Sequence, residues 1–508
     1  MGNNSVAVQF AMLAFSKANT LDNPRLKSNS LGILGKLQPQ IEQSEANLES
    51  ALRLAQEVQA ADLAWQWESE LGQRYQKQGK YQQAIQTYTS AINHLNQVRG
   101  NLAANPEIQF SFRDEVEPIY RQLVKLLLHP QNNSQPPQSN LVQARSTIES
   151  LQIAELDNFF RTACLQGQSV LLDRVVDRDD PKAAVIYPII LADRLAVILK
   201  LPNQPLHYYE TTIAQSEVEE LLAKLRQKLT KTYTLREVQS LSQQVYNWLV
   251  RPAESDLAKS RIKTLVFVLD GALRNTPMAA LYDGRQYLIE KYAVALSPGL
   301  QLLPPKSIEQ GHLKVLTAGL TGAHQGFSAL NNVELELEQI KAKVSSTELL
   351  NQRFTSTKLE KEINSDSFPI VHLATHGQFS SQADKTFVLA WDKPILVNEL
   401  NSFLQARDQS NPIDLLVLSA CETATGDKRA TLGLAGVAIR AGARSTLASL
   451  WLLDDESSAL MMGQFYQGLE KKLTKADAIR YAQLALLQNP QFAHPNYWAN
   501  FVLVGSWL

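Results

Sequence analysis

Apolar and polar positions divide the chain into a helical first part and a later part in which apolar runs alternate with helical segments. Up to about residue 128, apolar residues have the spacing of amphipathic helices. From residue 263 onward, continuous apolar runs bounded by turn residues predict buried strands. These predicted strands cover residues 264–269, 314–320, 369–376, 414–419, 445–452 and 500–504. Because helical patterns separate them, the predicted fold class is α/β, with a mostly parallel sheet covered on both faces.

Residues 71–91 match the spacing of a tetratricopeptide repeat, a two-helix unit of about 34 residues. The matching residues are Leu71, Gly72, Tyr75, Ala84, Tyr88 and Ala91. A weaker copy, Leu48 and Ala51, lies 40 residues before Tyr88 and Ala91. Any amphipathic helical hairpin is the alternative. With one convincing copy, the pattern predicts a short all-α, repeat-like region rather than a long solenoid.

A polar, proline-rich stretch over residues 129–139 predicts a linker after the helical region of residues 1–128. Residues 140–305 are predicted to contain helices and a β-hairpin over residues 184–201, and residues 306–508 carry most of the alternating strands and helices. The helices predicted after the linker cover residues 141–151, 155–166, 215–231, 234–249, 333–344, 357–363, 397–406, 432–441 and 456–472.

Two of the apolar runs end in reactive residues. VHLATHG ends in His376 and Gly377, and LLVLSACETATGD places Cys421 just after its apolar run. In open parallel sheets the carboxyl ends of the strands meet at one edge, where ligands bind. His376 precedes Cys421 by 45 positions, and in the caspase signature the histidine lies roughly 50 residues upstream of the cysteine. Each residue alone would be typical of a packed core, but together they favour a cysteine nucleophile with a histidine base.

Four blocks of the sequence resemble the CHAT family of bacterial caspase-like cysteine peptidase domains, which are commonly attached to tetratricopeptide repeats. The blocks are HLATHG, SACETATG, residues 265–298 and residues 494–505. The resemblance covers residues 151–508 and implies a caspase-like, three-layer α/β/α fold. Cys421 follows Ser419-Ala420 rather than the Gln-Ala of caspases, so caspase substrate rules are not transferred. By analogy with separases, residues 140–305, which lack a His/Cys pair, are interpreted as a possible pseudo-peptidase half.

The predicted chemistry is that of a Cys-His dyad. A thiol is a weak nucleophile until it ionises, so His376 would take the proton of Cys421 and later protonate the leaving amine. The caspase resemblance implies an oxyanion hole formed by the backbone N–H groups of Gly377 and Cys421. No third catalytic residue is assignable from the sequence.

The substrate cleft is predicted beyond the strand at residues 445–452, as the resemblance implies. Trp451 would form an apolar wall, and Asp454, Asp455 or Asp427 would attract a basic side chain, so cleavage after Arg or Lys is expected. The alternatives are that Asp454 or Asp455 caps the following helix and that Asp427 is a solvated turn residue. Trp451 and Leu453 would then line an apolar pocket.

Composition narrows the partners and the location. The 49 basic and 50 acidic residues give a formal net charge of −1, so no nucleic-acid or membrane partner is expected. Only two cysteines occur, Cys164 and Cys421, so no disulfide framework is expected and a cytoplasmic location is predicted. Cys164 falls on an amphipathic pattern that indicates a core position. No apolar run approaches the roughly 18 residues of a membrane helix.

Metal and cofactor sites are not predicted. His372 and His376 would lie about 13 Å apart on a strand, at about 3.3 Å per residue, so one metal ion could not bind both. His372 is therefore interpreted as structural. The glycine-containing stretch at residues 431–436 lacks the spacing and the lysine of a phosphate-binding loop, so no nucleotide cofactor is expected.

These inferences predict a cysteine endopeptidase that cleaves a protein or peptide substrate. The helical region is expected to bind a substrate or an activating protein, because repeats of this kind present a groove to a peptide or helix. The alternative is a catalytically latent scaffold or signalling protein that acts through protein–protein interaction.

Overall fold

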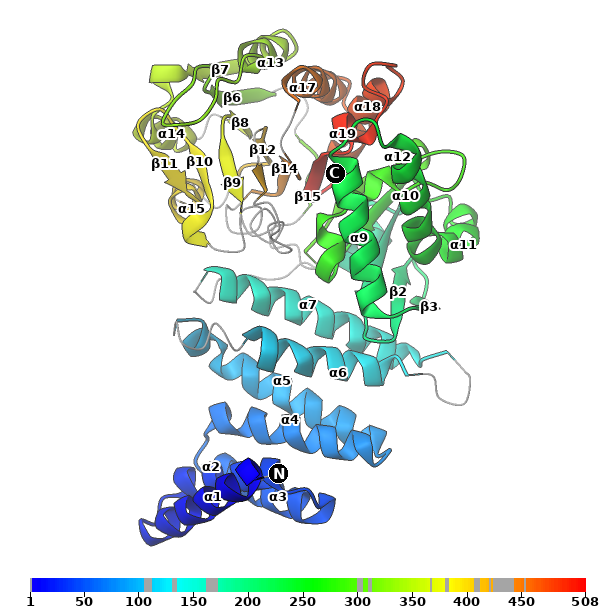
Figure 1. Ribbon diagram of the computed structural model, residues 1–508. Coiled ribbons are helices and arrows are strands. Elements are labelled where there is room, and N and C mark those ends of the chain that lie inside the picture. Colours follow the sequence, from blue (N-terminus) through cyan, green and yellow to red (C-terminus); the bar gives the residue numbers. More distant parts are fainter. Residues whose placement is uncertain are drawn as a thin grey trace. The chain divides into compact units, whose positions relative to one another are not determined.

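The computed structural model describes two compact units, Met1–Ala163 and Cys164–Leu508, coloured along the chain in Figure 1. The described residues are 2–104, 112–129, 135–160, 172–298, 305–308, 313–365, 368–379, 383–405, 412–419, 422–423, 443–451 and 454–508. In these ranges, no helix combines the length and the apolar character needed to cross a lipid bilayer.

The first unit is built of helices, each packed against the next along the chain. Its helices are α1 (Gly2–Thr20), α2 (Pro24–Leu37), α3 (Ile41–Glu57), α4 (Ala61–Lys77), α5 (Tyr81–Ala104), α6 (Glu117–Leu127) and α7 (Gln138–Phe160). The all-α region predicted from the sequence is confirmed. The hairpins α2–α3 and α4–α5 end their first helices 40 residues apart, at Leu37 and Lys77, so the weaker repeat copy is also a helical hairpin.

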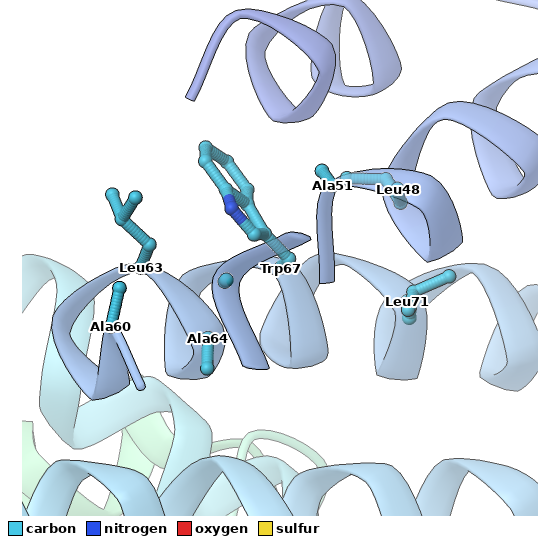
Figure 2. Packing of buried hydrophobic residues seen from close by; sticks show 8 residues of the cluster. Leu48, Ala51, Ala60, Leu63, Ala64, Trp67 and Leu71 are labelled. Atoms are coloured by element: carbon cyan, nitrogen blue, oxygen red, sulfur yellow. The ribbon is translucent and has the colours of Figure 1, made fainter. Parts of the chain in front are cut away.

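A small cluster of buried residues holds these hairpins together. Figure 2 shows its labelled members Leu48, Ala51, Ala60, Leu63, Ala64, Trp67 and Leu71. Trp67 is 1% exposed, and its Nε1 donates a hydrogen bond to the hydroxyl of Ser28 on α2 at 3.1 Å. A Cβ atom on Gly32 would come within 2.3 Å of the Trp67 ring, so only glycine allows α2 to approach this closely. Gly72 faces the Tyr88 ring in the same way, with a Cβ distance of 2.9 Å.

Helix α7 packs with the helical unit, whereas the sequence pattern had placed it in the region of residues 140–305. Its apolar side chains Leu141, Ala144 and Ile148 are buried, and α7 contacts both α6 and α5. Gln143 donates a hydrogen bond to Thr89 of α5 at 3.0 Å. The first unit therefore extends to Ala163 rather than ending at residue 128, and a single helix replaces the first of the two predicted segments and part of the second.

The second unit contains an 11-stranded sheet with the order β3-β2-β1-β4-β5-β15-β14-β12-β8-β6-β7. Its strands are β1 (Ala183–Ile190), β2 (Arg194–Lys200), β3 (His207–Thr212), β4 (Thr264–Phe267), β5 (Ala293–Leu296), β6 (Lys314–Gly319), β7 (Ser345–Leu350), β8 (Ile370–Ala374), β12 (Leu415–Leu418), β14 (Ser445–Ser449) and β15 (Phe501–Gly505). Among the described strands of this 11-stranded sheet, only the pairs β1–β2, β2–β3 and β14–β15 are antiparallel. The mostly parallel sheet predicted from the sequence is confirmed.

Helices accompany this sheet along the chain. They are α8 (Leu172–Arg174), α9 (Gln215–Leu229), α10 (Leu235–Leu249), α11 (Glu254–Lys259), α12 (Leu288–Lys291), α13 (Val333–Lys341), α14 (Ser356–Ile363), α15 (Val397–Gln405), α17 (Asp455–Glu470), α18 (Lys475–Leu487) and α19 (Pro495–Trp498). Helices α13, α17 and α18 lie side by side along the upper side of the strands in Figure 1. Strands β8 and β12 are buried along their whole length.

The two regions predicted as 140–305 and 306–508 share this one sheet. Strand β15, near the end of the chain, lies between β5 and β14, where it pairs parallel to β5 and antiparallel to β14. The strands before residue 305 are thus joined to the later ones by backbone hydrogen bonds.

A second, four-stranded sheet extends beyond the ends of β8 and β12, with the order β11-β10-β9-β13. Its strands are β9 (Gly377–Phe379), β10 (Phe387–Leu389), β11 (Pro394–Leu396) and β13 (Glu422–Thr423). Strand β9 follows β8 in the chain, and β13 follows β12.

Candidate active site

The chain segments that lead into and out of the predicted dyad run beside each other. Strands β8 and β12 are parallel neighbours, with Leu373 opposite Leu418, and the amide of Ser419 donates to the carbonyl of Leu373 at 2.9 Å. Further on, β9 and β13 are also parallel, with Gln378 opposite Glu422. His376 lies between the two paired positions of its own segment. Cys421 lies outside the described residues, as does Asp427.

His376 is half-buried, and its ring is held by the loop that follows β6. The His376 Nε2 atom lies 2.7 Å from the carbonyl oxygen of Ser328. A carbonyl oxygen can only accept a hydrogen bond, so Nε2 carries the hydrogen in this arrangement. In the neutral ring, Nδ1 is then the nitrogen that can take a proton. This arrangement is suited to a general base.

A tight turn brings Ser328 to His376. His324 and Phe327 exchange backbone hydrogen bonds of 3.1 and 2.9 Å, which closes a two-residue turn at Gln325 and Gly326. Both turn residues have positive φ angles, 48° and 87°, as a primed turn requires. The Phe327 ring stacks on the His376 ring, with centroids 5.0 Å apart and an interplanar angle of 29°.

The far side of this turn is anchored to Trp391, in the connection between β10 and β11. The His324 ring stacks on the Trp391 ring, with centroids 4.1 Å apart and an interplanar angle of 13°. The carbonyl oxygen of Trp391 also accepts hydrogen bonds from the His324 ring and, at 3.0 Å, from the Gln325 side chain. The turn is therefore fixed at both ends.

The backbone of Gly377 has a defined orientation in the small sheet. The amide of Leu389 donates to the carbonyl of His376 at 2.7 Å, so the Gly377–Val388 pair is a non-hydrogen-bonded pair of the antiparallel ladder. The N–H group of Gly377 therefore points away from β10, towards the side on which β13 pairs with β9.

His372 is fully buried on β8 and belongs to a separate polar cluster. Its Nδ1 lies 3.1 Å from the hydroxyl of Tyr466 on α17, and its Nε2 lies 3.0 Å from a carboxylate oxygen of Glu336 on α13. Burial, together with the charge of Glu336, raises the pKa of Tyr466 well above its usual value, so the phenol keeps its proton. The Tyr466 hydroxyl can then donate to Nδ1 while Nε2–H donates to Glu336. Both ring nitrogens are engaged, which supports the structural interpretation of His372.

Trp451 and Asp454 have roles in the structure that differ from the predicted cleft. Trp451 is 6% exposed, and its Nε1 donates to the carbonyl of Asn496 at 3.3 Å, so it is a core residue rather than an open wall. Asp454 is exposed and caps α17, with Oδ1 accepting from the amide of Ser457 at 2.9 Å. This is the capping alternative. Asp455 is the first residue of α17, and its side chain is not among those described.

His494, in a block that carries the family resemblance, is held in the neutral form. Its Nδ1 accepts a hydrogen bond from the amide of Asn496 at 3.0 Å, which caps α19. Burial lowers the pKa of His494 to about 4, so the ring is uncharged near neutral pH. Across the part of the chain that the structure describes, no three His, Cys, Asp or Glu side chains gather as metal ligands would.

Sequence reasoning missed Ser328 and Phe327. The useful local signal was the Gln325-Gly326 pair, because a glycine between polar and aromatic residues indicates a tight turn. That signal predicts a turn but not its contact with His376.

The turn that holds His376 should be destabilised when Gly326 gains a side chain. A Cβ atom would meet nothing within 4 Å, but the backbone φ of 87° is unfavourable for any other residue, at a cost of about 1–2 kcal/mol. We expect Gly326→Ala to speed hydrogen exchange in residues 321–330. Gly322→Ala is the matched control, because Gly322 is equally open and has no such φ angle. Equal exchange in both variants would contradict this account.

The capping role of Asp454 separates two substitutions. Asparagine keeps a capping oxygen and removes the charge, whereas alanine removes both, at a cost of about 1 kcal/mol. We expect Asp454→Ala to speed hydrogen exchange in the first turn of α17 roughly fivefold, and Asp454→Asn to stay close to the parent. Mass spectrometry of peptides from this turn measures the effect. Unchanged exchange in Asp454→Ala would show that the cap does not stabilise the helix.

This chain is similar to only a small part of each curated relative that it matches. Tetratricopeptide repeat protein 28 of Mus musculus is 23% identical over 322 residues, covering 52% of this chain and 13% of the mouse protein. Its Homo sapiens counterpart is 29% identical over 117 residues, covering 23% of this chain and 5% of the human protein. The chain therefore spans a small fraction of the length of these relatives.

Among solved structures, the Saccharomyces cerevisiae separase–securin complex is similar with a TM-score of 0.46 and 11% identity, over 99% of this chain and 46% of that chain. The Arg-specific cysteine proteinase gingipain R gives 0.36 and 10%, over 58% and 75%. Likenesses at these scores establish no function. The CHAT domain family model, in contrast, matches residues 239–506, which is more than half of the chain. This chain therefore belongs to the CHAT domain family.

Proposed function

We propose that this chain is a cysteine endopeptidase in which Cys421 is the nucleophile and His376 is its base. Family membership and strand register support this assignment. Cys421 directly precedes Glu422, which pairs with β9 opposite Gln378, two residues beyond His376. Consecutive Cα atoms are about 3.8 Å apart, so chain connectivity keeps Cys421 close to Glu422 and hence to the segment that carries His376.

The single observation that carries the proposal is the hydrogen bond from His376 Nε2 to the Ser328 carbonyl. It selects the tautomer in which Nδ1 is free to accept the thiol proton. When His376 becomes an imidazolium, the same bond becomes charge-assisted and roughly twice as strong. Ser328 would thus be the group that orients the base of the proposed dyad, and it would act through its backbone carbonyl.

In the proposed reaction, His376 Nδ1 takes the proton of the Cys421 thiol, and the thiolate attacks the peptide carbonyl carbon. The N–H groups of Gly377 and Cys421 would stabilise the resulting oxyanion, and such donors typically contribute about 3–4 kcal/mol. As the C–N bond breaks, Nδ1–H gives its proton to the leaving amine. His376 Nδ1 then takes a proton from a water molecule as the water oxygen attacks the thioester carbonyl carbon. The C–S bond breaks, the acid is released, and Nδ1–H returns its proton to the Cys421 thiolate.

Cleavage after Arg or Lys stays a prediction. Asp427 and Asp455 are the carboxylates still open to a role in an acidic pocket for a basic side chain, whereas Asp454 has a capping role. We also propose a cytoplasmic location, because a reducing compartment keeps a catalytic thiol reduced.

Selective alkylation tests the dyad. At pH 7 we expect limiting iodoacetamide to label Cys421 of the full-length chain roughly tenfold or more faster than Cys164, because a paired thiolate persists below the usual thiol pKa of about 8.5. His376→Ala should remove the difference. Peptide mass spectrometry measures both sites in one sample, so Cys164 is the internal control. Equal labelling of the two cysteines, or no effect of His376→Ala, would contradict the proposed dyad and favour the latent scaffold.

We further propose that the helical unit recruits a substrate or an activating protein, as its paired helical hairpins favour. Because the compact units divide at Ala163, a chain beginning at Cys164 should keep selective labelling of Cys421. The same truncation should lose cleavage of substrates that the full-length chain cuts in a native extract, measured by sequencing new N-termini. Undiminished cleavage by the shorter chain would remove the recruiting role.

A further inference from the structure

Next to His376 there is a group of apolar side chains that remain partly uncovered. Phe327 and Phe387 are both half-buried, with ring centroids 6.2 Å apart and an interplanar angle of 69°. Leu396, opposite Phe387 in the β10–β11 ladder, is 42% exposed. Residues directly opposite in a ladder share one face, so Leu396 continues the surface that Phe387 begins. We call Phe327, Phe387 and Leu396 the apolar patch.

The contact of this patch with His376 decides which part of a substrate can reach it. His376 gives a proton to the leaving amine, so the nitrogen of the residue after the scissile bond must come within hydrogen-bond distance of Nδ1. The side chain of that residue starts one carbon further on. The Phe327 ring is stacked on the His376 ring at 5.0 Å, which is within reach of such a side chain.

We propose that the apolar patch binds the side chain that directly follows the scissile bond and selects a large apolar or aromatic residue there. This inference rests on the proposed function and adds a substrate preference on the leaving side of the bond. A phenylalanine or leucine there would cover the exposed faces of Phe327 and Phe387, and aromatic rings at such separations prefer edge or offset contacts. Glycine or serine would leave the patch in water.

The preference is first measured by incubating the full-length chain with a mixed peptide library. The library is a digested proteome in which the amines of the peptides have been blocked. Sequencing of new N-termini should show Phe, Leu, Tyr or Met enriched as the first residue after the cut. Internally quenched peptides that differ only by Phe or Gly at this position then give the ratio of kcat/KM. We expect a ratio of roughly tenfold, the size of discrimination that an apolar site provides.

Three variants separate selection from the positioning of His376. Leu396→Ser and Phe387→Ala should lower the Phe/Gly ratio several-fold, because kcat/KM falls more for the Phe peptide than for the Gly peptide. Phe327→Leu should lower kcat for both peptides, because the ring also supports His376, and should lower the ratio as well. Leu335→Ser is the matched control, because Leu335 on α13 is 40% exposed and lies outside the patch. It should keep the parental ratio.

The outcomes distinguish this inference from the proposed function. Cleavage with no preference after the scissile bond, or an unchanged ratio in both Leu396→Ser and Phe387→Ala, would overturn the patch and leave the peptidase intact. A lowered ratio in Leu335→Ser as well would show a general loss of packing, which also counts against the patch. No cleavage of the library, together with equal labelling of Cys421 and Cys164, would overturn the proposed function and this inference with it.

Discussion

The parallel register between β8 and β12 is the constraint on which the candidate active site depends. It sets Leu373 opposite Leu418, and the pairing resumes at Gln378 and Glu422 after both strands have ended. A slip of one residue would turn every side chain of a strand to the opposite face of the sheet. Such a slip of either strand, both of which are fully buried, would also move His376 relative to the segment that carries Cys421.

The cluster of His372, Glu336 and Tyr466 reinforces that register from one side. It joins the middle of β8 to α13 and α17 through hydrogen bonds of 3.0 and 3.1 Å between buried side chains. Leaving a buried polar group without its partner costs about 1–3 kcal/mol, and more for a charged group. An alternative register would leave the buried Glu336 carboxylate without its His372 partner, so the cluster favours one placement of β8. Because His376 lies only four positions after His372, the placement of β8 also fixes where His376 lies.

The apolar runs made the central strands predictable, because a strand buried on both faces is apolar along most of its length. Strands β6, β8, β12, β14 and β15 fall within one residue of, or inside, their predicted ranges. The four-stranded sheet was not predictable, because its strands are two or three residues long and show no periodicity. The place of β15 between β5 and β14 was also hidden, since strand order depends on contacts between distant parts of the chain.

The site shows why chemistry is easier to read from a sequence than geometry. A nucleophile and a base must be particular side chains, so Cys421 and His376 stand out, and the alternative cap for Asp454 follows from a known helix preference. The group that orients His376 is a backbone carbonyl, which every residue has, so Ser328 has no signature in the sequence. What brings that carbonyl to the ring is a turn that ends 49 residues earlier, at Phe327, and the stacking of its aromatic residue on His376. In the proposed reaction the Phe327 ring would face the leaving side of the scissile bond, so one turn would both position the proposed base and shape the substrate preference.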